Sequence, residues 1–184
     1  MVGSYYGQDM DKWLYQNMDS TVFFAAGNVG SVRSITRESS SKNVISVGSS
    51  HTTLGSDNIT YVAFYSSRGP VYDNRFKPDI VSPGHQLNAA RASGTSSQTC
   101  DTVTYTGTSM ATPAAAGVAL MVRQYFLDSR FWPATCNSNY RNCRAFTPSG
   151  VLVRAVMVHG GARMTLFDGG GSNSVRLGKE GVCI

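Results

Sequence analysis

A serine lies at the start of a predicted helix, directly after a glycine turn. The segment Gly107-Thr108-Ser109-Met110-Ala111-Thr112-Pro113 leads into small and apolar residues up to Val122, as in a helix buried in a core. A serine hydroxyl is a useful nucleophile only where the fold exposes it, presents a base and stabilises the resulting oxyanion. The alternative, which is the commoner one for this position, is a helix N-cap.

Asn28 is a second residue whose position could serve chemistry. It follows the apolar run Thr21-Val22-Phe23-Phe24-Ala25-Ala26-Gly27, which predicts a strand buried on both faces in a parallel sheet. Asn28 would then lie just beyond the carboxyl end of that strand, where open α/β sheets place their ligand sites. Taken alone, an ordinary Gly-Asn turn that ends the strand is the simpler explanation.

Together these segments resemble the subtilases, the subtilisin-like serine peptidases. Gly107 to Pro113 is similar to the family's nucleophile motif, and Ala25 to Asn28 is similar to the segment with its oxyanion asparagine. A third stretch, Tyr65 to Pro70 followed by Lys77 to Gly84, resembles the sequence that these enzymes carry between the other two. The order is the same, and the resemblance covers about residues 1–165. The motifs favour subtilases over the related sedolisins.

The resemblance implies a role for each matching residue. Ser109 would attack the peptide carbonyl and become acylated, while its backbone N–H and the Asn28 side-chain amide would hold the oxyanion. The positive end of the helix would add to that field. The resemblance also implies a set of substrate-binding residues, namely Phe24, Ala25, Ala26, Gly27 and Thr108.

The base and the acid that a serine nucleophile requires are harder to find. In subtilases the order along the chain is Asp, His, Ser, yet only 27 residues precede Asn28, and no Asp-Ser/Thr-Gly or His-Gly-Thr-His occurs. His51 and His85 read as loop and turn residues, and His159 as the end of a helix. Asp79 matches a family position outside the triad. We therefore expect an incomplete triad.

Three functional hypotheses follow. The first is a fragment of a subtilase endopeptidase whose amino-terminal half carries the acid and base, and the second is a split enzyme in which another chain supplies them. The third is a non-catalytic peptide-binding or regulatory protein that keeps the fold. Retention of Ser109 and Asn28 argues against the third. We expect the chain alone to have no measurable peptidase activity.

Alternating elements predict the fold class. A helix is expected over residues 9–18 and strands near 21–26 and 44–48, and a third apolar stretch lies near 61–65. A stretch at 104–106 leads into the Ser109 helix, and Pro148 opens a second helix. This order indicates an α/β sandwich with a mostly parallel sheet. The resemblance to subtilases implies a three-layer αβα architecture of which the N-terminal part is missing. We assign residues 1–165 to a partial peptidase domain and 166–184 to an irregular tail.

Composition limits the partners and the location. The net charge of +5 is scattered, and no basic run of nucleic-acid type, no membrane-spanning stretch and no signal peptide is visible. We expect no metal and no cofactor, and a peptide or protein as the substrate. Four cysteines allow three full pairings, with Cys136 and Cys143 a natural local pair, and Asn58-Ile59-Thr60 is a glycosylation-type sequence. A secreted or lumenal location is expected for the intact parent protein.

Overall fold

Strand β2 (Ile45–Ser50) is the centre of the sheet. The computed structural model describes residues 5–52, 59–92, 94, 100–130, 144–164, 166–168 and 174–176. All six residues of β2 are buried, and it pairs in parallel with β1 (Phe23–Ala25) and with β4 (Ile80–Pro83). The glycine and small residues of Ile-Ser-Val-Gly-Ser-Ser suit a strand enclosed on both faces.

The sheet continues through two antiparallel pairings. Strand β3 (Tyr61–Val62) meets the end of β2 at the pair Ser50 and Val62, and then pairs in parallel with β7 (Leu166–Asp168). Strand β7 pairs antiparallel with β8 (Ser174–Arg176). Among the described strands of this six-stranded sheet, three pairings are parallel and two are antiparallel. This mostly parallel sheet confirms the predicted α/β class.

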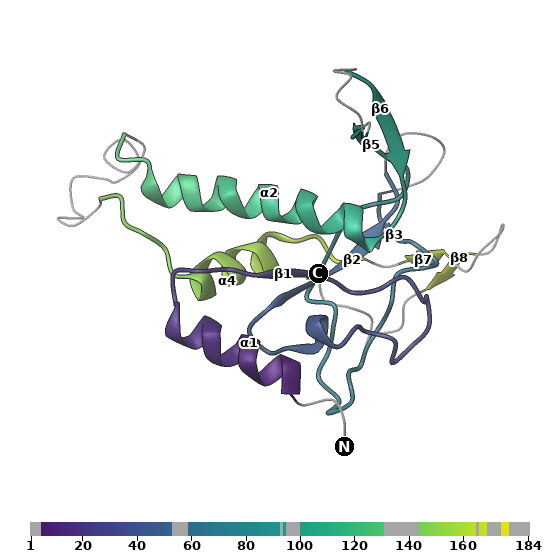
Figure 1. The fold of residues 1–184 in the computed structure, drawn as a ribbon, viewed down its shortest axis with the longest axis horizontal. Helices are drawn as coiled ribbons and strands as arrows, with labels where there is room; N and C mark the ends of the chain where they lie inside the picture. The colour runs from purple at the N-terminus through teal and green to yellow at the C-terminus, as the bar shows by residue number, and fades with distance from the viewer. Residues whose placement is uncertain are drawn as a thin grey trace.

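Helices cover both faces of β2. Ile45 and Val47 face α2 (Thr108–Leu127), whose Ala111 and Ala115 allow close approach, and Met157 of α4 (Gly150–Gly160) packs on the same cluster. On the opposite face the Ser46 hydroxyl bonds that of Ser39, in the 3-10 helix η1 (Glu38–Ser40), at 2.5 Å. Helix α1 (Tyr5–Gln16) contacts η1, and Figure 1 shows α1 and α2 on opposite sides of β1. These are the three predicted layers.

A separate hairpin leads into α2. Strands β5 (Leu87–Ala90) and β6 (Thr102–Tyr105) pair antiparallel and project from the body of the molecule (Figure 1). Thr102–Tyr105 lies close to the predicted stretch at 104–106, and the chain then enters α2 through Gly107. No helix in the described part of the chain is both long and apolar enough to span a bilayer.

Several elements differ from the sequence predictions. The first helix runs over Tyr5–Gln16 rather than 9–18, and the apolar stretch near 61–65 forms a strand only at Tyr61–Val62. Strand β1 is half-buried, not enclosed on both faces, because among the described residues it pairs only with β2. The sequence predicted no strand at β4, β5, β7 or β8, since all four are short and depend on distant pairing partners.

Two predictions concern the end of the chain and segments outside the described residues. Strands β7 and β8 lie beyond residue 165, in the stretch for which irregular structure was expected, while the domain boundary itself stays a prediction. Cys136, Cys143, Cys183 and Asn58 lie outside the described residues, whereas Cys100 is exposed.

Candidate active site

Ser109 is the second residue of α2 and is exposed. The N-cap is Gly107, with φ 155° and ψ 163° and no side-chain capping bond, so the interpretation of Ser109 as the cap is wrong. Gly107 N–H donates to Gly84 O at 2.9 Å, which anchors the turn next to the carboxyl end of β4. A glycine is required here, because its backbone angles lie in a region that side chains disfavour.

The first turn of α2 leaves one amide available. A helix start has N–H groups without intrahelical acceptors. Met110 and Ala111 N–H donate back to Gly107 O at 3.0 and 3.3 Å, and Thr108 N–H donates to the Asn28 side chain. In the part of the chain that the structure describes, the Ser109 N–H has no acceptor. This donor points out of a helix terminus whose dipole favours negative charge.

Asn28 and Thr108 are joined by two hydrogen bonds. The Asn28 Oδ1 atom accepts from the Thr108 N–H and from the Thr108 hydroxyl, both at 2.9 Å. The Thr108 hydroxyl in turn accepts from Gly27 N–H at 3.3 Å. Because the backbone amide can only donate, the carbonyl end of Asn28 must face Thr108, and its Nδ2 is left as a donor on the other side.

The remaining predicted substrate-binding residues lie on and just after β1. Phe24 and Ala25 are half-buried, whereas the Ala26 side chain has no exposed surface, so only its backbone can face a ligand. Gly27 has φ +113°, and a Cβ there would lie 2.8 Å from Ser67 Oγ. Its place therefore requires glycine and keeps the backbone open beside Asn28.

Tyr65 lies beside the turn at Gly107, a neighbour that the sequence did not reveal. Its hydroxyl and that of Ser49 are 2.7 Å apart. Burial raises the pKa of Tyr65, although the hydrogen bonds of Ser49 and of the Gly107 backbone oppose this shift. The phenol is therefore neutral at pH 7 and supports the turn through hydrogen bonding. A tyrosine 42 positions before Gly107 carries no sequence signal of this contact.

The three histidines comprise a neighbouring pair, His51 and His85, and a third residue in α4, His159. The His51 and His85 rings are 4.6 Å apart, and Tyr65 stacks on His85 with its ring centroid 5.9 Å away. His159 is exposed in the last turn of α4. The described residues contain no group of three or more His, Cys, Asp or Glu side chains that could hold a metal ion.

Asp79 belongs to a structural ion network. Its Oδ2 atom accepts from Lys77 Nζ at 2.6 Å and from Ser46 N–H at 2.8 Å, and its Oδ1 pairs with Arg154 Nη2 at 2.7 Å. Burial lowers the pKa of Lys77, and the Asp79 carboxylate opposes that shift. The network joins β2, the start of β4 and α4, so Asp79 has a structural role in place of a catalytic one.

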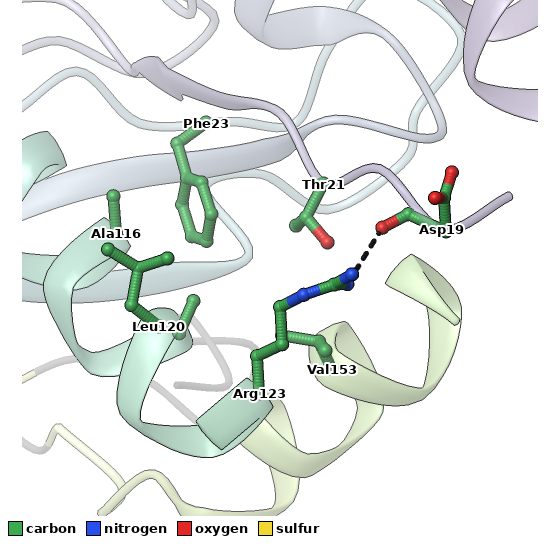
Figure 2. A pocket seen from close by; sticks show the side chains of 8 residues that line it. Asp19, Thr21, Phe23, Ala116, Leu120, Arg123 and Val153 are labelled. Carbon is green, nitrogen blue, oxygen red and sulfur yellow. Dashed lines mark hydrogen bonds between the residues drawn. The ribbon is translucent and has the colours of Figure 1, made fainter. Parts of the chain in front are cut away.

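A cavity of about 310 Å³ lies along α2 at the end away from Ser109. Figure 2 shows Phe23, Leu120 and Val153 facing it, with Arg123 at its edge donating to Asp19 O at 3.1 Å. Because its α2 residues lie about two to four turns from Ser109, the cavity is not part of the site around Asn28.

Comparisons with known proteins agree on one family. A model of the subtilase family matches residues 3–175. The chain is 37% identical over 105 residues to the serine protease/ABC transporter B family protein tagB of Dictyostelium discoideum, covering 52% of this chain and 5% of that protein. It is 38% identical over 114 residues to the serine protease AprX of Bacillus subtilis, covering 56% and 26%.

A solved structure gives the same result for the fold. The S41 psychrophilic protease aligns with a TM-score of 0.55 at 25% identity, covering 80% of this chain and 41% of that one. The chain thus spans less than half of these relatives, and the family model nevertheless covers nearly all of it. With its fold, its motif order and these matches, the chain belongs to the subtilase family of serine peptidases.

Proposed function

We propose that this chain supplies the nucleophile and the oxyanion site of a serine endopeptidase. The observation that carries the proposal is the pair of donors at the start of α2. The Ser109 N–H has no acceptor among the described residues, and the Asn28 amide is held with Nδ2 outward by two bonds to Thr108. Two preorganised donors next to an exposed serine are what an acyl-transfer site requires.

In the proposed reaction the Ser109 hydroxyl attacks the peptide carbonyl and passes its proton to a histidine base. The oxygen of the tetrahedral intermediate accepts from Ser109 N–H and Asn28 Nδ2. On collapse the histidine gives this proton to the leaving amine, which departs and leaves an acyl-enzyme that water hydrolyses. Phe24, Ala25, Ala26 and Gly27 would line the substrate cleft, and Thr108 would orient Asn28 through its two hydrogen bonds to Oδ1.

We propose further that the base and its carboxylate come from sequence outside these 184 residues, either from an amino-terminal half or from a second chain. The chain spans 41% of the S41 protease, and the helix that carries Ser109 is apolar on its outer side as well. Five apolar side chains on two sides of the helix are 42–68% exposed, and we call them together the outer face of α2: Val118, Leu120, Met121, Tyr125 and Leu127. A helix that is apolar all round is normally buried, so this face supports a missing covering layer.

The free edge of β1 and the cavity beside it also support structure missing on this side of the chain. The half-buried strand β1 has a free edge among the described residues, and a free edge in a parallel sheet normally receives another strand. The cavity beside Phe23 adjoins Leu120 and so continues the outer face of α2 (Figure 2). For the intact parent we propose a secreted or lumenal location and a peptide or protein substrate.

The test is active-site labelling with a fluorophosphonate probe. We expect no labelling and no peptide hydrolysis by the chain alone, and both when it is produced with an upstream subtilase segment that carries the acid and base. Ser109→Ala should abolish the restored activity. Asn28→Ala should lower the turnover about 10²–10³-fold, the effect known for this donor in subtilisin itself, while Asn88→Ala in β5 serves as the control.

Two outcomes would argue against the proposal. Restored hydrolysis that survives Ser109→Ala would assign the chemistry to another group. Peptide binding without any labelling, in a complex that is well folded, would favour a non-catalytic binding protein.

A further inference from the structure

The segment after Tyr65 holds both peptide neighbours of Asn28. Ser67 N–H donates to Gly27 O at 2.9 Å, and the Ser67 hydroxyl accepts from Val29 N–H at 3.2 Å. Ser67 has no exposed surface, so leaving its amide or its hydroxyl without a partner would be costly. Asn28 is therefore fixed by Thr108 at its side chain and by Ser67 along its backbone.

Arg68 holds the next turn of the same loop. Its Nη2 donates to Gly30 O at 2.8 Å, and its backbone N–H donates to Ser31 O at 3.2 Å. Gly30 has φ +74°, and a Cβ there would lie 2.4 Å from Phe64 O. The loop thus turns sharply against the 64–68 segment and presents its carbonyl to the guanidinium.

The guanidinium of Arg68 lies over an aromatic ring from the far end of the chain. Its central carbon is 4.0 Å from the ring centroid of Phe167 in β7, and Phe167 packs with Val62 and Met164 in a buried cluster. Burial lowers the pKa of Arg68, yet an arginine remains charged at neutral pH. A partly dehydrated cation over a ring face is a favourable arrangement.

We propose that Arg68 is a positioning residue for Asn28, and that strand β7 anchors Arg68 through Phe167. This assignment rests on the proposed function, in which Asn28 is the oxyanion donor. The ring holds the guanidinium, the guanidinium holds Gly30 O, and Gly30 follows Asn28 by two residues. The oxyanion site then depends on strand β7, which lies close to the carboxyl end of the residues that the family model matches.

A single backbone amide can report on this arrangement. Thr108 is the first residue of α2, so its N–H has no intrahelical acceptor and is protected by the bond to Asn28 Oδ1. Its hydrogen exchange can be followed by NMR in the full chain, with an osmolyte to favour the folded state. Ile45 N–H, which donates to Val22 O at 2.9 Å in the sheet, reports on global unfolding. Asn28→Ala defines complete loss of the reporter bond.

Arg68→Met keeps the aliphatic stem and removes the guanidinium. We expect exchange of the Thr108 amide to become about tenfold faster, about 1.4 kcal/mol, with exchange of Ile45 unchanged. Phe167→Leu should act in the same direction in the wild-type background and have no further effect in Arg68→Met, because the ring acts through Arg68. Arg33→Met is the matched control, since Arg33 bonds the exposed Asn74 from the same loop.

The assignment is overturned if Arg68→Met leaves the Thr108 amide protected while Asn28→Ala exposes it. It is also overturned if the Thr108 and Ile45 amides accelerate equally, or if the two substitutions act additively. None of these readouts uses catalysis. A selective effect at Thr108, together with failure of Ser109 labelling, would reject the proposed function and leave the role of Arg68 in positioning Asn28 intact.

Discussion

Replacing Asp79 by Asn should destabilise this chain strongly, although none of the described hydrogen-bond partners of Asp79 belongs to the candidate site. Asp79 is 10% exposed at its side chain and pairs with Lys77, which is 2% exposed, at 2.6 Å. Among the described residues, Lys77 Nζ has one other hydrogen-bond partner, Val44 O at 2.9 Å. An asparagine keeps the shape of the side chain and removes the charge, so the buried ammonium loses its counter-ion.

The magnitude follows from the burial of this pair. Breaking a buried ion pair by removing one partner costs about 3–5 kcal/mol. The second ion-pair partner of Asp79 is Arg154, whose side chain is 30% exposed and partly screened by water. We therefore expect a loss at the lower end of this range, about 3 kcal/mol. With a urea slope of about 2 kcal/mol per molar, the midpoint should fall by about 1.5 M. Domains have only about 5–15 kcal/mol in total.

The assay is urea unfolding followed by circular dichroism, in osmolyte if the wild type requires it. Lys77→Met in the Asp79→Asn background should recover most of the loss, because it removes the buried ammonium that the first substitution leaves without a counter-ion. Asp73→Asn is the control, since Asp73 pairs with Arg75 at the surface and should leave the midpoint unchanged. An Asp79→Asn midpoint equal to that of the wild type, or a double variant less stable than Asp79→Asn, would refute this reasoning.

Three other predictions use the same unfolding and labelling measurements. Burial lowers the pKa of Lys77 below its ordinary value of 10.5, so between the folded and the unfolded pKa the unfolded chain binds more protons. The free energy of unfolding should therefore rise with pH over this interval more steeply than that of Lys77→Met. An equal pH dependence of the two proteins would contradict this prediction. Gly27→Ala should cost about 1–3 kcal/mol through its positive φ and the contact with Ser67, whereas Gly117→Ala, in α2 with open space around it, should be neutral or stabilising by up to about 1 kcal/mol. Leu120→Gln should raise the monomeric fraction of the chain alone in size-exclusion chromatography and weaken the restoration of Ser109 labelling by an upstream segment; loss of solubility would contradict an exposed apolar face.

Local patterns were sufficient where a long run of small or apolar residues marks the element. The small and apolar residues after Gly107 predicted α2, and the run that ends at Ala26 predicted β1, because periodicity and composition act over neighbouring residues. They were insufficient for β4 and β7, each four residues or fewer, which exist as strands only through pairing with β2 and β3. Local patterns did not fix burial either, since β1 and β2 were both predicted as strands and β1 is half-buried while β2 is fully enclosed.

The sequence by itself determined the family resemblance, the α/β class and the candidate pair Ser109 and Asn28, because these depend on residue types at short spacings. Only the tertiary structure decided that Gly107, not Ser109, is the helix cap, and that Thr108 orients the Asn28 amide across 80 positions of sequence. It alone also brought Arg68 onto Phe167. The physical reason is that hydrogen bonds and ring contacts are directional and short-ranged, so they exist only once the sheet has brought distant segments together.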